Sequence, residues 1–260
     1  MLCSLPPEIL DLIVDHLHDK PTALKACCLV SKSWIPRTRR HLFTCVTFTP
    51  VLHPLVLWMK MFPDPSNSPA HYARSLIIHR LPTIIGTDAD VASCARTFHN
   101  VVHVYFKFLT WKDHEAPLVP FYGFSHTVRS LNLIHSSFEV FDLICSFPFL
   151  EDLALIDFRP GSGTIGWSAP STSPKFTGSL ELRSRGGIHL AIRRLLDFPD
   201  GLHFAEITAS CFDGDFDSMV DLVSRCSDTL EYLSIYCFSP GEFPPVELHG
   251  RTIPYRYSWT

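Results

Sequence analysis

The chain lacks long apolar runs and any large excess of charge of one sign. Its longest strongly apolar stretch, residues 101–109, is interrupted by His103 and Lys107 and is far shorter than the roughly 20 residues that a bilayer helix needs. The 22 basic and 26 acidic residues give a net charge of -4, which is too balanced for the electrostatic footprint of a nucleic-acid-binding protein. We therefore expect neither a membrane nor a nucleic acid as a partner.

The sequence also lacks a Cys-x-x-Cys pair and the features of a signal peptide. Its nine cysteines are scattered, most of them within apolar patterns, so we interpret them as reduced core residues. The first five residues contain no basic residue, and Glu8, Asp11 and Asp15 interrupt the apolar stretch that follows. These observations predict a cytoplasmic or nuclear protein.

Motifs for cofactors are present only in part. Gly161, Gly163 and Gly166 have the spacing of a dinucleotide fingerprint, but Pro170 and Pro174 follow in place of the helix that would receive a pyrophosphate. Because no helix follows, the glycines are interpreted as part of a flexible loop.

Motifs for metals and catalysis are also incomplete. Asp213, Asp215 and Asp217 begin like a calcium loop, yet serine occupies the positions that require glycine and glutamate. Asp217 or Ser218 is instead predicted to cap the following helix. The sequence has no His-Glu-x-x-His, no Cys/His quartet and no Gly-x-Ser-x-Gly elbow. We expect no metal, no cofactor and no enzymatic activity; a site assembled from distant residues is the alternative.

The first 43 residues predict three short helices. Residues 7–17 carry an apolar stripe at helical spacing, formed by Ile9, Leu10, Ile13, Val14 and Leu17. Pro7 suits the first turn of this helix, and a second helix beginning at Pro21 carries Leu24, Cys27 and Cys28. A third helix is expected to end near Phe43. Helices this short are marginally stable alone, so the segment needs a partner surface.

This segment resembles the F-box. The matching residues are Leu5-Pro6-Pro7-Glu8-Ile9-Leu10, then Ile13 and Leu17, then Leu24, Cys28, Val30 and Trp34. The run 23–34, followed by Pro36-Arg37 and His41-Leu42-Phe43, resembles the F-box variant common in mushroom-forming fungi. The resemblance implies binding to the Skp-type adaptor of a cullin-RING ubiquitin ligase through Leu5, Pro6, Ile9, Ile13, Leu24, Val30 and Trp34. Otherwise, these are simply the first helices of a globular fold.

Beyond a proline-rich stretch, an apolar pattern recurs. Five prolines between residues 49 and 70 predict a linker with one short helix around Trp58. The pattern of an apolar residue, two spacers, an apolar residue, one spacer and an apolar residue then occurs seven times, at intervals of 22 to 28 residues. The triplets are Ala73, Leu76, Ile78; Val101, Val104, Phe106; Val128, Leu131, Leu133; Leu150, Leu153, Leu155; Thr177, Leu180, Leu182; Leu202, Ala205, Ile207; and Leu230, Leu233, Ile235.

Helix-spaced apolar residues lie between some of the triplets. They are Val91, Cys94, Ala95, Phe98; Phe138, Phe141, Ile144, Cys145; Ile188, Ala191, Ile192, Leu195; and Phe216, Met219, Val220, Val223. Each unit is therefore predicted to be a strand followed by a helix, and stacked units form an α/β solenoid with parallel strands inside and helices outside. This body resembles the irregular leucine-rich repeats that often follow an F-box. Because the asparagine-rich turn of regular repeats is absent, an α/β layered domain with another strand order is the alternative.

The predicted organisation has four parts. They are an F-box-like domain (residues 1–48), a proline-rich linker (49–70), a leucine-rich-repeat-like domain (71–238) and a C-terminal tail (239–260). The stretch 159–175, rich in glycine, serine and proline, is predicted to be an exposed loop. The tail either wraps over the last repeat through its aromatic residues or leads into further chain.

Strand residues outside the triplets are predicted to line the concave face in two columns, because side chains alternate along a strand. The first column contains Ile77, Tyr105, Asn132, Ala154, Glu181, Glu206 and Ser234, and the second contains His79, Lys107, Ile134, Ile156, Arg183, Thr208 and Tyr236. Aromatic and arginine side chains often contribute much of the interface energy. We therefore predict Tyr105, Arg183 and Tyr236 as anchors for a target protein, with Lys107 beside them and Ile134 and Ile156 as an exposed apolar strip.

These patterns predict a non-catalytic substrate-recognition subunit of a cullin-RING ubiquitin ligase. Its partners would be a Skp-type adaptor, bound through the F-box-like helices, and an unknown target protein, bound through the repeats. The alternative is a repeat-containing interaction scaffold that has no coupling to a ubiquitin ligase.

Overall fold

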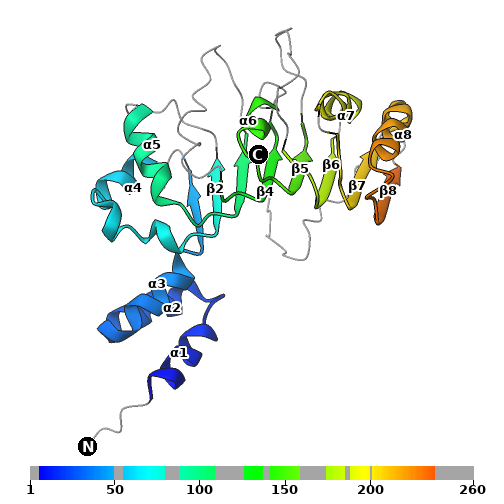
Figure 1. Cartoon of the computed structure of the whole chain (residues 1–260). Helices are drawn as coiled ribbons and strands as arrows, with labels where there is room; N and C mark the ends of the chain where they lie inside the picture. The colour runs from blue at the N-terminus through cyan, green and yellow to red at the C-terminus, as the bar shows by residue number, and fades with distance from the viewer. Residues whose placement is uncertain are drawn as a thin grey trace, which may run out of the picture.

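The protein has the predicted α/β architecture. The computed structural model describes residues 6–49, 55–79, 88–108, 126–136, 141–158, 174–184, 188–199 and 201–237. Within these ranges, eight parallel strands form one open sheet, in which the strands follow one another in chain order (Figure 1). This order contradicts the alternative of a layered domain with another strand order. Residues 159–173 of the predicted loop 159–175, its three glycines and the tail 239–260 lie outside the described residues, as does Leu5.

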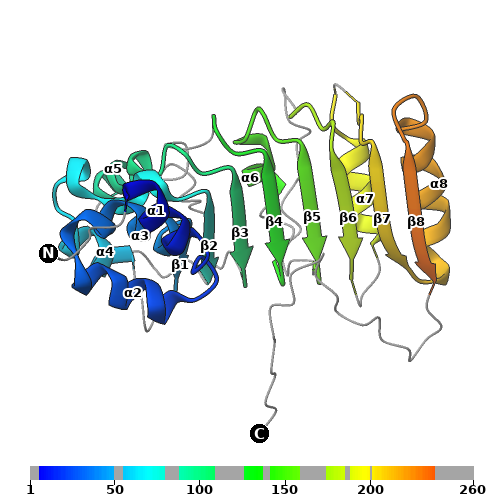
Figure 2. The same ribbon diagram turned by 90° about the horizontal axis from the view of Figure 1, so that it is seen from below.

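Helices cover one face of the sheet, and three more project from its first strand (Figures 1 and 2). The strands are β1 (Cys45–Phe48), β2 (Ser75–His79), β3 (His103–Lys107), β4 (Ser130–Ile134), β5 (Asp152–Ile156), β6 (Ser179–Arg183), β7 (Glu206–Cys211) and β8 (Tyr232–Cys237). The α-helices are α1 (Pro7–Asp15), α2 (Pro21–Val30), α3 (Ile35–Leu42), α4 (Leu55–Met61), α5 (Asp88–Thr97), α6 (Phe141–Cys145), α7 (His189–Leu196) and α8 (Phe216–Arg225). Short 3₁₀ helices include η1 (Lys32–Trp34) and η6 (Asp213–Asp215).

The strands begin with a repeated hydrogen-bond arrangement. The carbonyl of Thr44, just before β1, accepts the backbone N–H groups of both Arg74 and Ser75, and the carbonyl of Arg74 accepts those of Val102 and His103 in the same way. The arrangement continues through the carbonyls of Val102 and Arg129, and again through those of Gly178 and Ala205. Because each unit satisfies the polar backbone groups of the next, the units stack in register.

The core lies between the sheet and its covering helices. Two inward residues of nearly every strand are buried there, for example Leu131 and Leu133 in β4 and Leu153 and Leu155 in β5. Burying a side chain of this size stabilises the fold by about 1.5–3 kcal/mol. The predicted inward phase of the strands is therefore correct in β2 to β6.

Two of the predicted triplets require correction. In the sixth unit, Ile207 pairs with Leu180 and Leu233, so the triplet is Phe204, Ile207, Ala209, two residues later than predicted. In the fifth unit, Thr177 is exposed and its neighbour Phe176 is buried in the first position. The spacing of apolar residues alone does not distinguish overlapping triplets, and one extra residue before β6 moves the apolar side chain of Phe176 away from the expected position.

The sheet begins inside the range assigned to the N-terminal module. Strand β1 pairs with β2, and Phe43, Val46 and Phe48 repeat the triplet pattern in an eighth unit that precedes the predicted range 71–238. The predicted helix around Trp58 is confirmed as α4, and its indole is buried in the same core. Trp58 makes edge contacts with the rings of Phe43 and Phe48, at centroid distances of 5.9 and 5.8 Å. The proline-rich stretch thus contributes to the core.

The four predicted helices between strands are confirmed as α5 to α8, but the buried side of α8 differs from the prediction. Met219 and Leu222 are buried, whereas Phe216 and Val220 are exposed. The capping prediction was also wrong, because Asp217 and Ser218 lie within α8. Asp215 is the buried carboxylate, and it accepts hydrogen bonds from the backbone N–H groups of Ile188, His189 and Phe212.

Candidate functional site

The first three helices form a small module with little core of its own. Val14 of α1 and Leu24 and Cys27 of α2 are buried in it, and Thr38 of α3 is fully buried beside them. The Thr38 hydroxyl donates to the carbonyls of Trp34 and Ile35, and it lies 2.8 Å from Cys28 Sγ. So few buried side chains provide limited stability, which gives polar contacts between the helices more weight.

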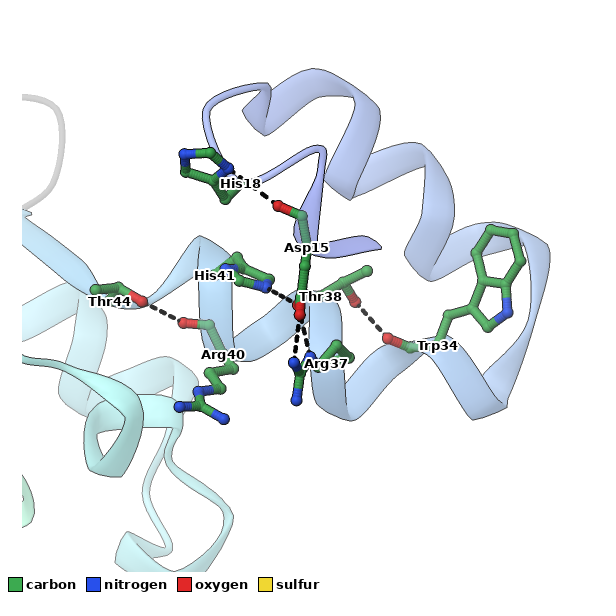
Figure 3. Close-up of polar contacts among 8 residues, drawn as sticks. All are labelled: Asp15, His18, Trp34, Arg37, Thr38, Arg40, His41 and Thr44. Carbon is green, nitrogen blue, oxygen red and sulfur yellow. Dashed lines mark hydrogen bonds and ion pairs between the residues drawn. The ribbon is translucent and has the colours of Figure 1, made fainter. Parts of the chain in front are cut away.

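Asp15, at the end of α1, joins that helix to α3 (Figure 3). Its carboxylate accepts a hydrogen bond of 2.7 Å from Arg37 Nε and a second one from Arg37 Nη2, and His41 Nε2 lies 2.7 Å from Oδ1. The hydrogen bonds from Arg37, followed by the contact with His41, hold the pKa of Asp15 well below its usual range. A bidentate arginine–carboxylate contact constrains the orientation of the two groups as well as their distance, so it restrains the angle between α1 and α3.

Apolar side chains face outward from this module. On α1 they are Ile9, Leu12 and Ile13, and at the end of α2 they are Leu29 and Val30, which are 89% and 71% exposed. We call these five residues the N-terminal apolar set. Residues at positions i, i+3 and i+4 share one face of a helix, so the three residues of α1 lie together. Large aliphatic side chains this exposed indicate a surface that a partner covers.

The predicted adaptor-binding residues separate into two groups. Pro6, Ile9, Ile13 and Val30 are exposed, and Trp34 is half-buried, with its ring directed away from Asp15 in Figure 3. Leu24 is 1% exposed and belongs to the module's own core, so we no longer propose it as a contact residue. Leu12 and Leu29 were missed, although Leu12 shares the helical spacing of Ile9 and Leu29 directly precedes Val30.

The face of the sheet away from the core holds the two predicted columns, with one correction. In register, Glu181 pairs with Thr208, and Ser210 pairs with Tyr236. Thr208 therefore belongs to the first column and Ser210 to the second, while Glu206 pairs with Ser179 and Tyr232 outside both. The error follows from the misplaced sixth triplet.

The predicted exposed apolar strip on this face is buried. Ile134 and Ile156 are adjacent in register and only 9% and 6% exposed, and they form a small second cluster with Ala154. Lys107 is also buried, and Tyr105 and Arg183 are half-buried, which leaves Tyr236 as the one predicted anchor that is largely exposed. Aliphatic neighbours and the long stems of Lys107 and Arg183 shield one another in this row.

Charged groups on this face are perturbed by burial. Desolvation lowers the pKa of Lys107, and it lowers the pKa of His79 together with the nearby charge of Lys107. Arg183 Nε lies 2.6 Å from Glu181 Oε1, which makes an ion pair between neighbouring positions of β6. These groups form a polar row beside the aliphatic cluster.

Three consecutive strands end in a residue with positive φ. Phe108, His135 and Asp157 follow β3, β4 and β5, and each donates its backbone N–H to the last carbonyl of the next strand. The Phe108 and His135 rings stack at 4.8 Å, and His135 Nδ1 lies 3.4 Å from Asp157 Oδ2. A non-glycine residue in this region is strained, and the repeated hydrogen bond offsets the strain. We interpret these three residues as a structural feature that ends each strand, because one of them occurs at the same place in each of three consecutive units.

The described residues were also compared with the requirements of a metal cluster and of a membrane-spanning helix. No cluster of three or more His, Cys, Asp or Glu side chains in the described ranges could hold a metal ion. No helix in the same ranges is long and apolar enough to cross a membrane. The chain matches no protein-family model, and no curated protein matches it significantly in sequence.

Proposed function

We propose that this chain is the substrate-recognition subunit of a cullin-RING ubiquitin ligase. Its N-terminal helices dock on a Skp-type adaptor, its sheet body holds a target protein, and other subunits of the ligase modify that target. The observation that carries the proposal is the N-terminal apolar set: five exposed aliphatic side chains on a small helical module that projects from one end of the sheet. The receptor brings reactants together and does no chemistry itself.

The arrangement of the body supports this proposal. Stacked strand–helix units in chain order suit a leucine-rich-repeat-like solenoid, and the corrected triplets begin 22 to 30 residues apart, close to the usual range. Such solenoids present a continuous surface for protein recognition. Within it, Tyr236 is our preferred anchor for the target, and Tyr105 and Arg183 are half-buried contributors. Ile134, Ile156 and Lys107 are no longer proposed as contacts.

The adaptor-binding part of the proposal is tested with single aspartate substitutions. Ile9→Asp and Leu29→Asp each place a charge in the proposed interface, and we expect each to weaken binding of a Skp-type adaptor at least tenfold, the equivalent of about 1.4 kcal/mol. Binding is measured by co-purification of the co-expressed adaptor and by titration calorimetry. Circular dichroism should show that both variants keep the fold, because the substituted side chains are exposed.

The matched control is Leu190→Asp on α7. Leu190 is 39% exposed, close to the 42% of Ile9, but it lies outside the N-terminal module. This variant should bind the adaptor as the unmodified chain does. If the unmodified chain binds no Skp-type adaptor, the role of the helices is structural, and the alternative of a scaffold without ligase coupling replaces the proposal.

A further inference from the structure

The two edges of the sheet are protected differently. At the β1 edge, the chain enters from α3, and helices α1 to α4 gather at that end (Figures 1 and 2). At the other edge, the described residues place a strand on only one side of β8, namely β7. Edge strands usually avoid pairing with other chains by means of a charge, a proline or a bulge. Residues 232–237, Tyr-Leu-Ser-Ile-Tyr-Cys, contain no charged residue and no proline.

The exposed side chains of β8 are symmetric about Ser234. Tyr232 and Tyr236, two residues before and after it, are 57% and 52% exposed. Leu233 and Ile235, its immediate neighbours, are 42% and 38% exposed, although they occupy inward positions that are buried in the strands before. In chemical character, the run from Tyr232 to Tyr236 therefore reads the same in both directions.

A strand with this symmetry is complementary to its own copy. In an antiparallel pair, directly opposed residues point to the same face, and a twofold axis through Ser234 would place Tyr232 opposite Tyr236 of the other copy. The same axis would place Leu233 opposite Ile235 on the inner face and the small Ser234 opposite itself. Aromatic and aliphatic cross-strand pairs of this kind stabilise antiparallel sheets.

Helix α8 adds apolar surface at the same end. Phe216 and Val220 lie one turn apart and are exposed, although α8 buries Met219 and Leu222 in the core. A twofold axis perpendicular to the sheet would leave the helices of both copies on one face and bring the two α8 helices to either side of the axis. A side-by-side pair of strands and helices would bury these apolar side chains, which are exposed at the last unit that the structure describes.

We propose that β8 pairs antiparallel with β8 of a second copy of this chain, about a twofold axis through Ser234. The partner is another copy because the exposed strand is its own complement, and the twofold pairs the two β8 strands at the edge of each described sheet. The interface is small, so we expect a dissociation constant on the order of micromolar. This dimer does not depend on adaptor binding, because β8 and the N-terminal module lie at opposite ends of the sheet.

Disulfide crosslinking of the full chain tests both the dimer and its register. The exposed Cys45 and Cys237, and also Cys3, are first replaced by serine. In that background, Ser234→Cys alone should form a covalent dimer with copper–phenanthroline, because opposed residues lie about 4.5–5.5 Å apart at Cα, within disulfide range. The copper oxidant takes two electrons from each thiol pair, and two protons are released.

The neighbouring positions provide the control for register. Tyr232→Cys and Tyr236→Cys should not crosslink when each is oxidised alone, because identical residues would then lie about 14 Å apart along the strands. A mixture of the two variants should crosslink. Sedimentation velocity at roughly 100 times the expected dissociation constant should show a dimer for the background in which Cys3, Cys45 and Cys237 are serine, and Ser234→Lys should shift it to monomer.

Several outcomes would overturn the proposal. They are a monomer at every concentration, efficient crosslinking of Tyr232→Cys alone, or a ladder of higher oligomers in place of a single dimer. Circular dichroism of each variant separates loss of pairing from loss of folding. An unchanged dimer in Ser234→Lys would place the interface elsewhere.

Discussion

At the residue scale, Gly178 marks the one described strand start where the regular hydrogen bonds change. The carbonyl of Glu151 accepts only the Gly178 N–H there, and the Ser179 N–H donates to Asp152 Oδ1 at 2.7 Å instead. The Ser179 hydroxyl also contacts this oxygen, at 2.9 Å. The absence of a side chain on Gly178 leaves room for the Asp152 carboxylate, so a side chain replaces a backbone acceptor at the junction of β5 and β6.

We predict that Gly178→Ala destabilises the protein by on the order of 2 kcal/mol. A Cβ atom at Gly178 would lie 2.2 Å from Asp152 Oδ1 and would displace the carboxylate from Ser179. Urea unfolding measures the loss. Gly214→Ala is the control, because nothing lies within 4 Å of a Cβ at that position, and it should leave the free energy of unfolding nearly unchanged. Equal losses in both variants would contradict this account of Gly178.

Some residue-level features were accessible from the sequence, and others were not. Helical spacing correctly grouped Leu24 with Cys27, but it could not tell that Leu24 faces the module's own core, because a stripe has the same spacing whichever surface covers it. Alternation along β4 and β5 correctly placed Ile134 and Ile156 on the face away from the core. Their burial there depends on packing in three dimensions, which a period of two does not encode.

At the scale of elements, the repeated triplet predicted seven of the eight strands. It missed β1 because that strand closely follows α3. Phe43, the first residue of the β1 triplet, had already been assigned to the end of the third F-box-like helix. It misplaced the sixth unit because Leu202, Ala205 and Ile207 also fit the pattern, and only pairing with β6 and β8 distinguishes the two registers. Pairing with neighbouring strands, absent from a one-dimensional pattern, decides between overlapping candidates.

The inward phase of β4 can be tested with two adjacent substitutions. We predict that Leu131→Asp unfolds the body, because Leu131 is fully buried and an unpaired carboxylate there costs several kcal/mol. Asn132→Asp, one residue later on the other face, should cost less than about 1 kcal/mol. Thermal melts followed by circular dichroism compare the two, and similar losses in both would refute the assigned phase.

At the scale of the whole molecule, the structure separates two surfaces. The N-terminal apolar set lies at the β1 end of the sheet, and the symmetric strand β8 lies at the other end (Figure 2). The sequence predicted a helical segment before a strand–helix body, because helical and alternating periods are local. It could not predict that β8 is the last strand of the sheet within the described residues, with Tyr232 and Tyr236 exposed, since that depends on how the strands pair. A dimer through β8 would carry its two docking modules at the far ends of a continuous sheet.

The central claim is that the N-terminal helices, and not the sheet, bind the adaptor. Hydrogen–deuterium exchange of the full chain, with and without a saturating Skp-type adaptor, tests this claim most directly. We predict slower exchange in residues 7–34, where the N-terminal apolar set lies, and unchanged exchange in β2 to β8. Protection confined to the sheet, or no protection anywhere in the presence of the adaptor, would contradict the proposed function.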